Sequence, residues 1–187
     1  RMFKCPRMLK IIAQKMGLVI LRRFNPEWAH CIAVFFLRVL QWPTRLGFIP
    51  EGRPAVFAIS EGLAFPSRLG LAAGFDKSAE VFAGLSRVGF GFVEVGTVTL
   101  HPQNGNPKPR LWRTGEYALV NQMGFNNCGL KRFYKNLRRY KHQVRIPIFV
   151  NVGKGKDSTN ALEDYATLLR ELDPLADGFV INVSSPN

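Results

Sequence analysis

Polar side chains lie at the ends of apolar runs in this sequence, where they could bind a ligand. Lys77 follows the first run, Thr97 ends the second, and Asn151 and Asn182 lie within the third and fourth. Each asparagine needs a polar partner, because a buried amide without one costs about 1–3 kcal/mol. A flat, polar heterocycle is one such partner, since it can meet both the donor and the acceptor of an amide.

Each of these residues also has a purely structural interpretation. Gly74 could end a strand, Lys77 could be a solvated lysine at a helix start, and the two asparagines could cap turns. Taken singly, the residues favour these structural roles. Asn151 and Asn182 fit them least well, because each lies inside an apolar run.

Other kinds of catalytic site are not indicated. None of the three histidines adjoins Ser184 or Ser185, as a catalytic triad would require. Asp76 has no second carboxylate at the strand ends, so acid hydrolysis is not expected. The three cysteines are far apart and form no CxxC, so the sequence predicts neither a metal site nor a disulfide framework.

The elements that position these side chains alternate between strands and helices. Apolar runs cover residues 69–75, 92–98, 148–153 and 178–184. Helical patterns cover 78–88, 127–140 and 159–172, the last beginning at Ser158 or Thr159. This alternation predicts an α/β fold with a parallel sheet. The carboxyl ends of such strands share one face, where barrel enzymes build their active sites.

Four units are half of a (β/α)8 TIM barrel, which takes about 250 residues. We therefore expect a barrel truncated to about its first four βα units. A doubly wound sheet is the alternative, but no GxGxxG follows the first run. The first residue, Arg1, and the last, Asn187, which directly follows a strand, favour a fragment of a longer protein.

The first 43 residues show a different pattern. Residues 1–24 place apolar positions at helical spacing among Lys and Arg side chains, which predicts a cationic amphipathic helix. Asn25 and Pro26 then read as a cap and first residue of a second helix, which Pro43 should stop. That helix is shorter than the roughly 20 apolar residues of a membrane span. It could lie on a membrane or pack on the rest of the protein.

The charge of the chain favours anionic partners. Its 26 basic and 13 acidic side chains give a net charge of +13. Membrane surfaces and nucleic acid are equally compatible with this charge alone. No RNP motif, zinc finger or recognition-helix signature supports nucleic acid, so a basic nucleic-acid-binding module stays a lesser alternative.

Several segments together resemble one family, the class 2, quinone-dependent dihydroorotate dehydrogenases. The similarity runs from about residue 25 to the end of the chain. The matching segments are LAAGFDK (71–77), GFGFVEVGTVT (89–99), PQNGNPKPR (102–110), NQMGFNN (121–127), VNVGKGKD (150–157) and INVSSPN (181–187). GFDK together with NVSSPN is nearly diagnostic of the family.

The resemblance implies a flavoenzyme that oxidises dihydroorotate to orotate in pyrimidine synthesis. It implies that Ser185 is the base that takes the C5 proton while hydride passes to FMN. The FMN contacts it implies are Ala73, Gly74, Lys77, Thr97, Asn151 and Asn182. The substrate contacts it implies are Lys77, Asn121, Gln122, Met123, Gly124, Phe125, Asn182 and Asn187.

The resemblance also gives the amino-terminal helices a role. Residues 1–43 are expected to form a membrane-associated extension that leads a quinone to the flavin, and residues 44–187 the first half of the barrel. This favours an anionic membrane surface over nucleic acid as the partner. It implies a peripheral protein of the bacterial inner membrane, on its cytoplasmic face, or of the mitochondrial inner membrane.

Some features depart from the family pattern. Ser67-Arg68 stands where an Asn-Pro-like pair is common, and Gln122 stands where Arg is common. The lysine near the pyrimidine ring and the glycine-rich phosphate site of the family belong to strands five to eight. We therefore expect the 187-residue piece alone to be inactive and unable to hold FMN. Another FMN-dependent barrel, such as a class 1 or dihydropyrimidine dehydrogenase-like enzyme, is the alternative. An essential cysteine in place of Ser185 would favour it.

Overall fold

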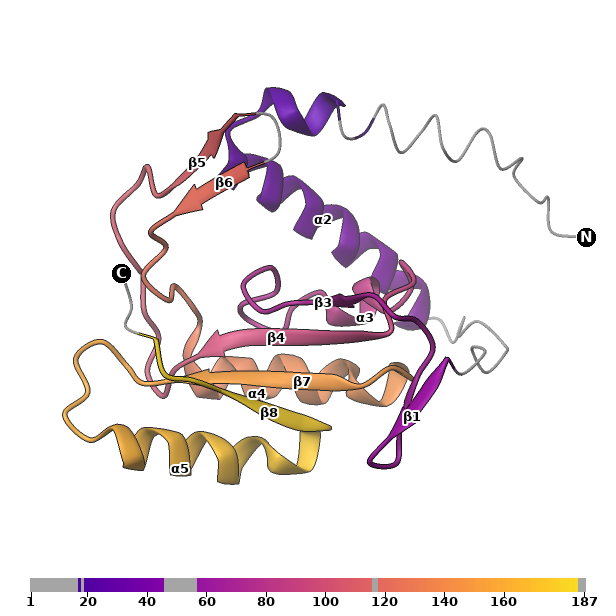
Figure 1. Cartoon of the computed structure of the whole chain (residues 1–187), viewed down its shortest axis with the longest axis vertical. Coiled ribbons are helices and arrows are strands. Elements are labelled where there is room, and N and C mark those ends of the chain that lie inside the picture. Colours follow the sequence, from indigo (N-terminus) through magenta and orange to yellow (C-terminus); the bar gives the residue numbers. More distant parts are fainter. Residues whose placement is uncertain (1–16, 18, 46–56, 116–117, 185–187) are drawn as a thin grey trace, which may run out of the picture.

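The computed structural model describes residue 17 and residues 19–45, 57–115 and 118–184, with the side chains of residues 42–45 left aside. Its centre is a four-stranded parallel sheet in the order β3-β4-β7-β8 (Figure 1). The strands are β3 (Gly70–Leu71), β4 (Phe92–Val98), β7 (Ile148–Gly153) and β8 (Gly178–Asn182). Each strand pairs with the next one of the sheet in chain order, which confirms the predicted parallel α/β arrangement.

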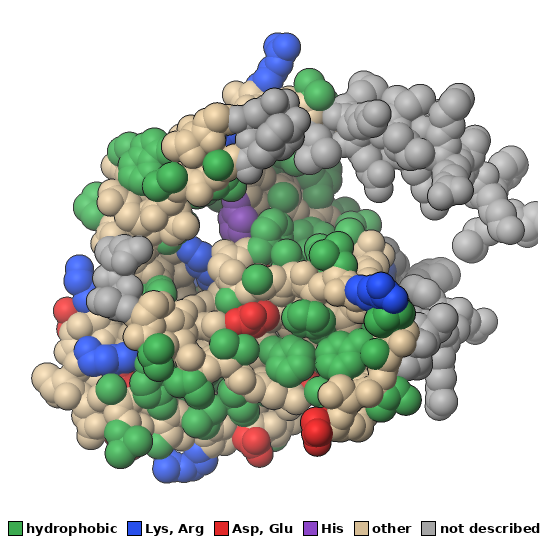
Figure 2. Space-filling model, in the orientation of Figure 1, with side chains coloured by type: hydrophobic (Ala, Val, Ile, Leu, Met, Phe, Trp, Pro, Cys, Tyr) green, Lys and Arg blue, Asp and Glu red, His purple; other side chains and the backbone are tan. Residues whose placement is uncertain are grey.

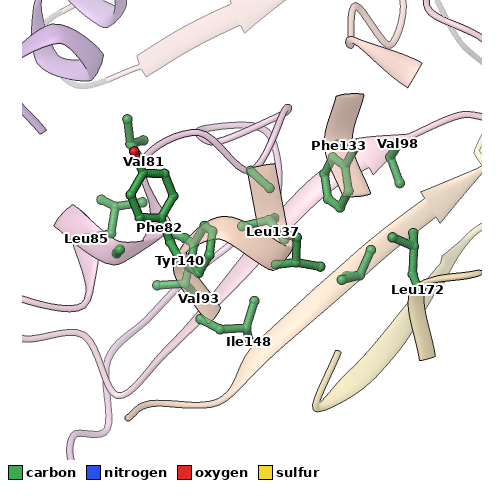
Figure 3. Close-up of a cluster of buried hydrophobic side chains, with 14 of the residues drawn as sticks. Val81, Phe82, Leu85, Val93, Val98, Phe133, Leu137, Tyr140, Ile148 and Leu172 are labelled. Atoms are coloured by element: carbon green, nitrogen blue, oxygen red, sulfur yellow. The ribbon is translucent and has the colours of Figure 1, made fainter. Parts of the chain in front are cut away.

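Three helices connect these strands and cover one face of the sheet. They are α3 (Phe82–Leu85), α4 (Gly129–Tyr140) and α5 (Ala161–Leu172). Alternate side chains of the central strands, such as Val95 and Val150, are fully buried against them. From the helices, Phe133 and Leu137 of α4 and Leu172 of α5 complete the same core (Figure 3). Helices on a single face are typical of a barrel wall and not of a doubly wound sheet.

The opposite face of the sheet carries the other alternate residues. Phe92 and Phe149 lie edge to face there, with ring centroids 5.7 Å apart. Towards the carboxyl ends the same face turns polar, with Glu94 two residues after Phe92 and Asn151 two residues after Phe149. Because side chains alternate along a strand, this face points to the barrel interior.

Two antiparallel hairpins were not predicted. One joins β1 (Ala58–Ser60) to β2 (Leu63–Phe65), and the other joins β5 (Leu111–Thr114) to β6 (Ala118–Asn121). Each of these strands has only three or four residues, too few to show a clear period, and β1, β5 and β6 are mostly exposed.

Several predicted bounds are wrong. The helix expected at 78–88 is only Phe82–Leu85, because the preceding residues wrap around the Asp76 carboxylate, which accepts the amides of Glu80 (2.7 Å) and Val81 (2.8 Å). The strand expected at 69–75 is regular only over Gly70–Leu71.

The start expected for the third predicted helix, at Ser158 or Thr159, is also wrong. Helix α5 begins at Ala161, and Asn160 caps it by accepting the amide of Glu163 at 3.2 Å. An asparagine supplies a cap as readily as serine or threonine does, so the neighbouring hydroxyls misled the prediction.

Helix α2 (Pro26–Arg45) lies beyond the β3 edge of the sheet, where it packs against α3 (Figure 1). The predicted cap is present, since Asn25 Oδ1 accepts the amide of Glu27 at 2.9 Å. The predicted stop at Pro43 is wrong: the helix continues to Arg45, because proline removes one intrahelical hydrogen bond without preventing helical geometry beyond it. Residues 19–23 are also helical, whereas Met8, Ile11 and Ile12 lie outside the described residues.

Helix α2 is held to the barrel wall through close backbone packing. The amide of Gly84 donates to Gln41 Oε1 (3.2 Å), and Gln41 Nε2 donates to the carbonyl of Glu80 (2.9 Å). A Cβ on Gly84 would lie 2.5 Å from the carbonyl oxygen of Leu37. Only glycine therefore allows α2 and α3 to approach this closely. Within the described residues, no helix has the length and apolarity needed to cross a membrane.

We predict that Gly84→Ala in the full-length protein loosens the docking of α2 and lowers the free energy of unfolding by about 1–3 kcal/mol, because the methyl group meets backbone atoms that cannot rotate away. Urea denaturation measures this change. Gly155→Ala is the control, since its Cβ would come no closer than 3.5 Å to another atom. Equal stability of the two variants would contradict the packing described.

Candidate active site

Three polar side chains meet at the carboxyl ends of β4, β7 and β8. Thr97 Oγ1 donates to Asn151 Oδ1 at 2.6 Å, and Asn182 Nδ2 lies 3.1 Å from Thr97 Oγ1 and 3.3 Å from Asn151 Oδ1. We call these three residues the amide cluster. The strand register produces it, because Gly96 pairs with Asn151 and Gly153 with Asn182 across neighbouring strands.

Glu94 orients this cluster, and the sequence analysis missed it. Asn151 Nδ2 donates to Glu94 Oε1 at 2.6 Å. An ionised carboxylate can only accept, so the amino group of Asn151 must face Glu94 and its carbonyl oxygen must face Thr97 and Asn182. A signal was available: Glu94 is the one charged residue of β4, and it lies on the same face of the sheet as Asn151.

The end of β8 is fixed from both sides. Asn182 Oδ1 accepts the amide of Ser184 at 3.0 Å and also the Ser184 hydroxyl. The Tyr165 hydroxyl of α5 donates to the carbonyl of Asn182 at 2.7 Å. Two of the predicted site residues, Ser185 and Asn187, lie outside the described residues.

The segment after β3 lies beside the end of β4. The amide of Gly74 donates to the carbonyl of Gly96 at 2.9 Å, and the amide of Gly96 donates to the carbonyl of Asp76 at 3.0 Å. Gly74 has a φ of +102° and open space where a Cβ would be, so both its conformation and its surroundings suit glycine. Gly74 thus leaves a surface without a side chain beside Gly96 at the end of β4, and Ala73, with only a methyl group, precedes it.

Lys77 extends from this segment in a half-buried position. Its Nζ donates to Asn126 Oδ1 at 2.7 Å. Burial lowers the pKa of the Lys77 ammonium from 10.5 to about 8, and the positive charge of Arg110 adds to this, against a smaller opposing effect of Glu27. An anionic ligand would therefore bind Lys77 more strongly than it would bind a fully hydrated lysine, because part of the dehydration has already taken place.

Asp76 supports Lys77 from inside the protein. Burial raises the pKa of the Asp76 carboxyl from 3.8 to about 6, although the backbone amides of Glu80 and Val81 stabilise its charged form. These hydrogen bonds set the turn that follows Lys77. The partners of Asp76 are thus backbone amides, which give this carboxylate a structural role.

The connection that follows β6 reaches the same region. Phe125 has a φ of +52°, and its ring lies 3.5 Å from the position of a Cβ on Gly153, whose other near neighbour is the Thr97 methyl group. The Lys77–Asn126 hydrogen bond places this connection next to Lys77 as well. Phe125 and Asn126 therefore join the amide cluster to the Lys77 segment.

The rest of the predicted substrate segment is held by the loop that precedes β5. Asn121 is the last residue of β6, and its Oδ1 accepts the amide of Met123 at 3.4 Å. The amide of Gln122 donates to the carbonyl of Arg110 (3.0 Å), and Asn106 contacts Gly124 closely, with a Cβ there 2.8 Å from the Asn106 amide. Asn121 and Gln122 are exposed, so they lie at the rim of the site.

The amino-terminal end of α2 covers the Lys77 side of the site. Arg110 is buried and donates to Glu27 Oε1 at 2.8 and 3.1 Å, which ties α2 to the loop before β5. His30 Nε2 lies 2.7 Å from the carbonyl oxygen of Phe75, two residues before Lys77. Figure 2 shows the molecule hollowed at this level, with histidine and Lys or Arg side chains at the wall.

The side chains that meet here are not those of a metal centre. Among the residues that the structure describes, no group of three or more His, Cys, Asp or Glu side chains could hold a metal ion. The groups that converge are amides, hydroxyls, one carboxylate and one ammonium. Such groups bind a polar organic ligand with a negative charge.

Comparison with known proteins gives the family of the chain. Residues 59–187 match the family model of dihydroorotate dehydrogenase. A protein of Thermus thermophilus named dihydroorotate dehydrogenase (quinone) is 46% identical over 174 residues, covering 87% of this chain and 50% of that protein. A protein of the same name from Rhodopseudomonas palustris is 46% identical over 172 residues, covering 91% of this chain and 46% of that protein. The chain belongs to the dihydroorotate dehydrogenase family.

Solved structures agree with this family. The dihydroorotate dehydrogenase of Eimeria tenella in its ligand-free form superposes with a TM-score of 0.75 at 37% identity, and its complex with ferulenol with a TM-score of 0.72 at 38% identity. Each match covers 87% of this chain, and 46% and 45% of the respective structures. The sheet is thus of the TIM-barrel type, and the chain spans about half the length of the curated relatives it matches.

We predict that Glu94→Ala lowers the free energy of unfolding of the full-length protein by about 1–3 kcal/mol, because Asn151 Nδ2 loses its acceptor inside the sheet. Glu94→Gln keeps an acceptor oxygen and should recover most of the loss. Glu171→Ala, on the exposed face of α5, should stay within about 0.5 kcal/mol of wild type. Chemical denaturation distinguishes these outcomes, and a Glu94→Ala protein as stable as the control would contradict the orienting role.

Proposed function

We propose that the full-length protein containing this chain oxidises dihydroorotate to orotate with bound FMN and passes the electrons to a membrane quinone, a step of pyrimidine synthesis. Membership of the family implies a flavin cofactor. The names of the curated relatives specify quinone as the electron acceptor. The observation that carries the proposal is the convergence of Lys77, Thr97, Asn151 and Asn182 at one end of the parallel sheet.

The residues present fit a flavin at this place. Gly74 leaves open space beside the end of β4, and Asn182 is only partly buried, so a planar ring can approach both. The residues that would contact FMN are Ala73, Gly74, Lys77, Thr97, Asn151 and Asn182. FMN would accept the hydride from dihydroorotate and pass electrons on to the quinone.

The residues of this chain would bind and deprotonate the substrate. The Lys77 ammonium would pair with the carboxylate of dihydroorotate. The residues that would surround the rest of the substrate are Asn121, Gln122, Met123, Gly124, Phe125, Asn182 and Asn187. Ser185 would take the C5 proton, which requires exclusion of water and a route for the proton, because a serine hydroxyl is a weak base.

Helix α2 would connect the site to the membrane. Its face away from the sheet is apolar and exposed, with Trp28 at 69% and Phe35 and Phe36 each at 61% exposure. Aromatic side chains of this kind favour the interface of a bilayer. We assign residues 1–43 to the membrane and quinone extension and residues 44–187 to the first half of the barrel.

This extension would make the protein peripheral, on the cytoplasmic face of a bacterial inner membrane or at the mitochondrial inner membrane. The cationic side chains of residues 1–24 would face anionic lipid. The apolar face of α2 favours a membrane over nucleic acid as the partner. The quinone in the names of the relatives favours it as well.

We predict that kcat/KM for dihydroorotate in the full-length enzyme falls above about pH 8. Lys77 carries its charge below its lowered pKa and loses it as the pH rises through 8, so the carboxylate of the substrate loses its partner. Lys77→Arg keeps the charge at alkaline pH. Its kcat/KM should be lower than that of wild type but should not show the fall near pH 8.

The measurement is a pH series of initial rates with a soluble electron acceptor. Failure of the wild-type enzyme to oxidise dihydroorotate would contradict the proposed function. A fall above pH 8 that persists unchanged in Lys77→Arg would contradict the role of Lys77 alone.

A further inference from the structure

The outward face of α4 is entirely basic. The helix has 12 residues and no acidic side chain. Its inward face buries Phe133, Leu137 and Tyr140. We call the exposed side the α4 basic face, made up of Lys131, Arg132, Lys135, Arg138 and Arg139.

Helix stability accounts for only part of this face, namely Arg138 and Arg139 in the last turn, where the helix dipole favours cations. Lys131 and Lys135, and Lys135 and Arg139, are four residues apart, so like charges repel along the helix. Lys131 also lies in the first turn, where the helix dipole disfavours a cation. Helix α5 shows the opposite and usual arrangement, with Glu163 and Asp164 in its first turn. The concentration of charge on α4 therefore points to an anionic partner.

The α4 basic face is continuous with helix α2. Glu80 accepts from Arg38 of α2 with one carboxylate oxygen and from Arg132 of α4 with the other, at 3.4 Å. Arg38 adjoins the exposed apolar face of α2, because it lies three residues after the exposed Phe35 and therefore next to it on the helix. A surface that carries aromatic side chains next to fixed cations matches the boundary between lipid chains and headgroups.

Two hollows lie beside α4, next to its basic face. One, of about 310 Å³, lies between α2 and α4 and is lined by three cations, Arg38, Arg132 and Arg139. It also contains one carboxylate, Glu80, which pairs with Arg38 and Arg132 and leaves the hollow with an excess of positive charge. The other, of about 510 Å³, lies at the start of α4 and has Lys131, Arg132 and Lys135 over Leu100 and Pro102. Each offers several cationic donors to one phosphate-sized group, and Arg132 lines both.

We propose that the α4 basic face binds the phosphodiester headgroups of anionic phospholipids, one in each hollow, while the apolar face of α2 rests on the same membrane. The inference rests on the proposed function, because it completes the membrane contact made by α2. Nucleic acid is the other polyanion that fits five cations. It gains nothing from exposed Trp28, Phe35 and Phe36, so the neighbouring apolar face favours lipid.

The test is co-sedimentation of the full-length protein with vesicles of phosphatidylcholine, with and without phosphatidylglycerol. Lys135→Gln with Arg139→Gln removes one cation from each hollow. A basic side chain at an anionic surface contributes about fivefold in binding, so this double variant should bind the anionic vesicles roughly 25-fold more weakly. Arg145→Gln with Arg170→Gln, two exposed cations outside α4, is the matched control and should change binding less than about threefold, since distant charges are screened.

Oxidation of dihydroorotate with a soluble dye should be the same in all these proteins. Equal weakening by both double variants, or no weakening by the α4 pair, would overturn the inference while leaving the proposed function intact. Displacement of the wild-type protein from anionic vesicles by duplex DNA would also overturn it. Absence of dihydroorotate oxidation in wild type would overturn the function on which the inference rests.

Discussion

A chain of hydrogen bonds from Glu94 through Asn151 to Thr97 and Asn182 joins three parallel strands at their carboxyl ends. The carboxylate fixes which way the Asn151 amide points, and this in turn fixes which atoms remain for a ligand. Polar groups inside a sheet destabilise it unless they bond one another. The same contacts that satisfy these buried groups therefore hold the binding surface rigid, which is what an active site requires.

The second part of the site depends on a different constraint, the burial of charge near Lys77. Asp76 folds its own turn by accepting backbone amides, and Arg110 is held by Glu27 at the start of α2. Lys77 is partly buried near these groups and loses part of its hydration, which lowers its pKa. A bound anion would therefore stabilise the charged form of its ammonium. Because Glu27 and His30 belong to α2, the helix that would meet the membrane also forms a wall of the site.

The sequence was informative where side chains repeat with a clear period or match a long motif. Strands β4, β7 and β8 and helix α4 are apolar at the spacing of their elements, and they were predicted nearly in full. Strands β5 and β6 are exposed and carry no such pattern, so they were missed. Glu94 was overlooked because its link to Asn151 depends on the register between β4 and β7, which the sequence does not give. Asn160 competed with Ser158 and Thr159 for the same cap, and local sequence does not decide between them.

The central claim is that the amide cluster faces one flavin ring. The most direct measurement is the dissociation constant of FMN from full-length Asn151→Leu, followed by flavin fluorescence, with circular dichroism to verify folding. Leucine fills the same volume but offers no donor or acceptor, so the account predicts FMN binding weakened roughly ten- to hundredfold. A folded Asn151→Leu protein that binds FMN as tightly as wild type, with an unchanged visible spectrum, would contradict it.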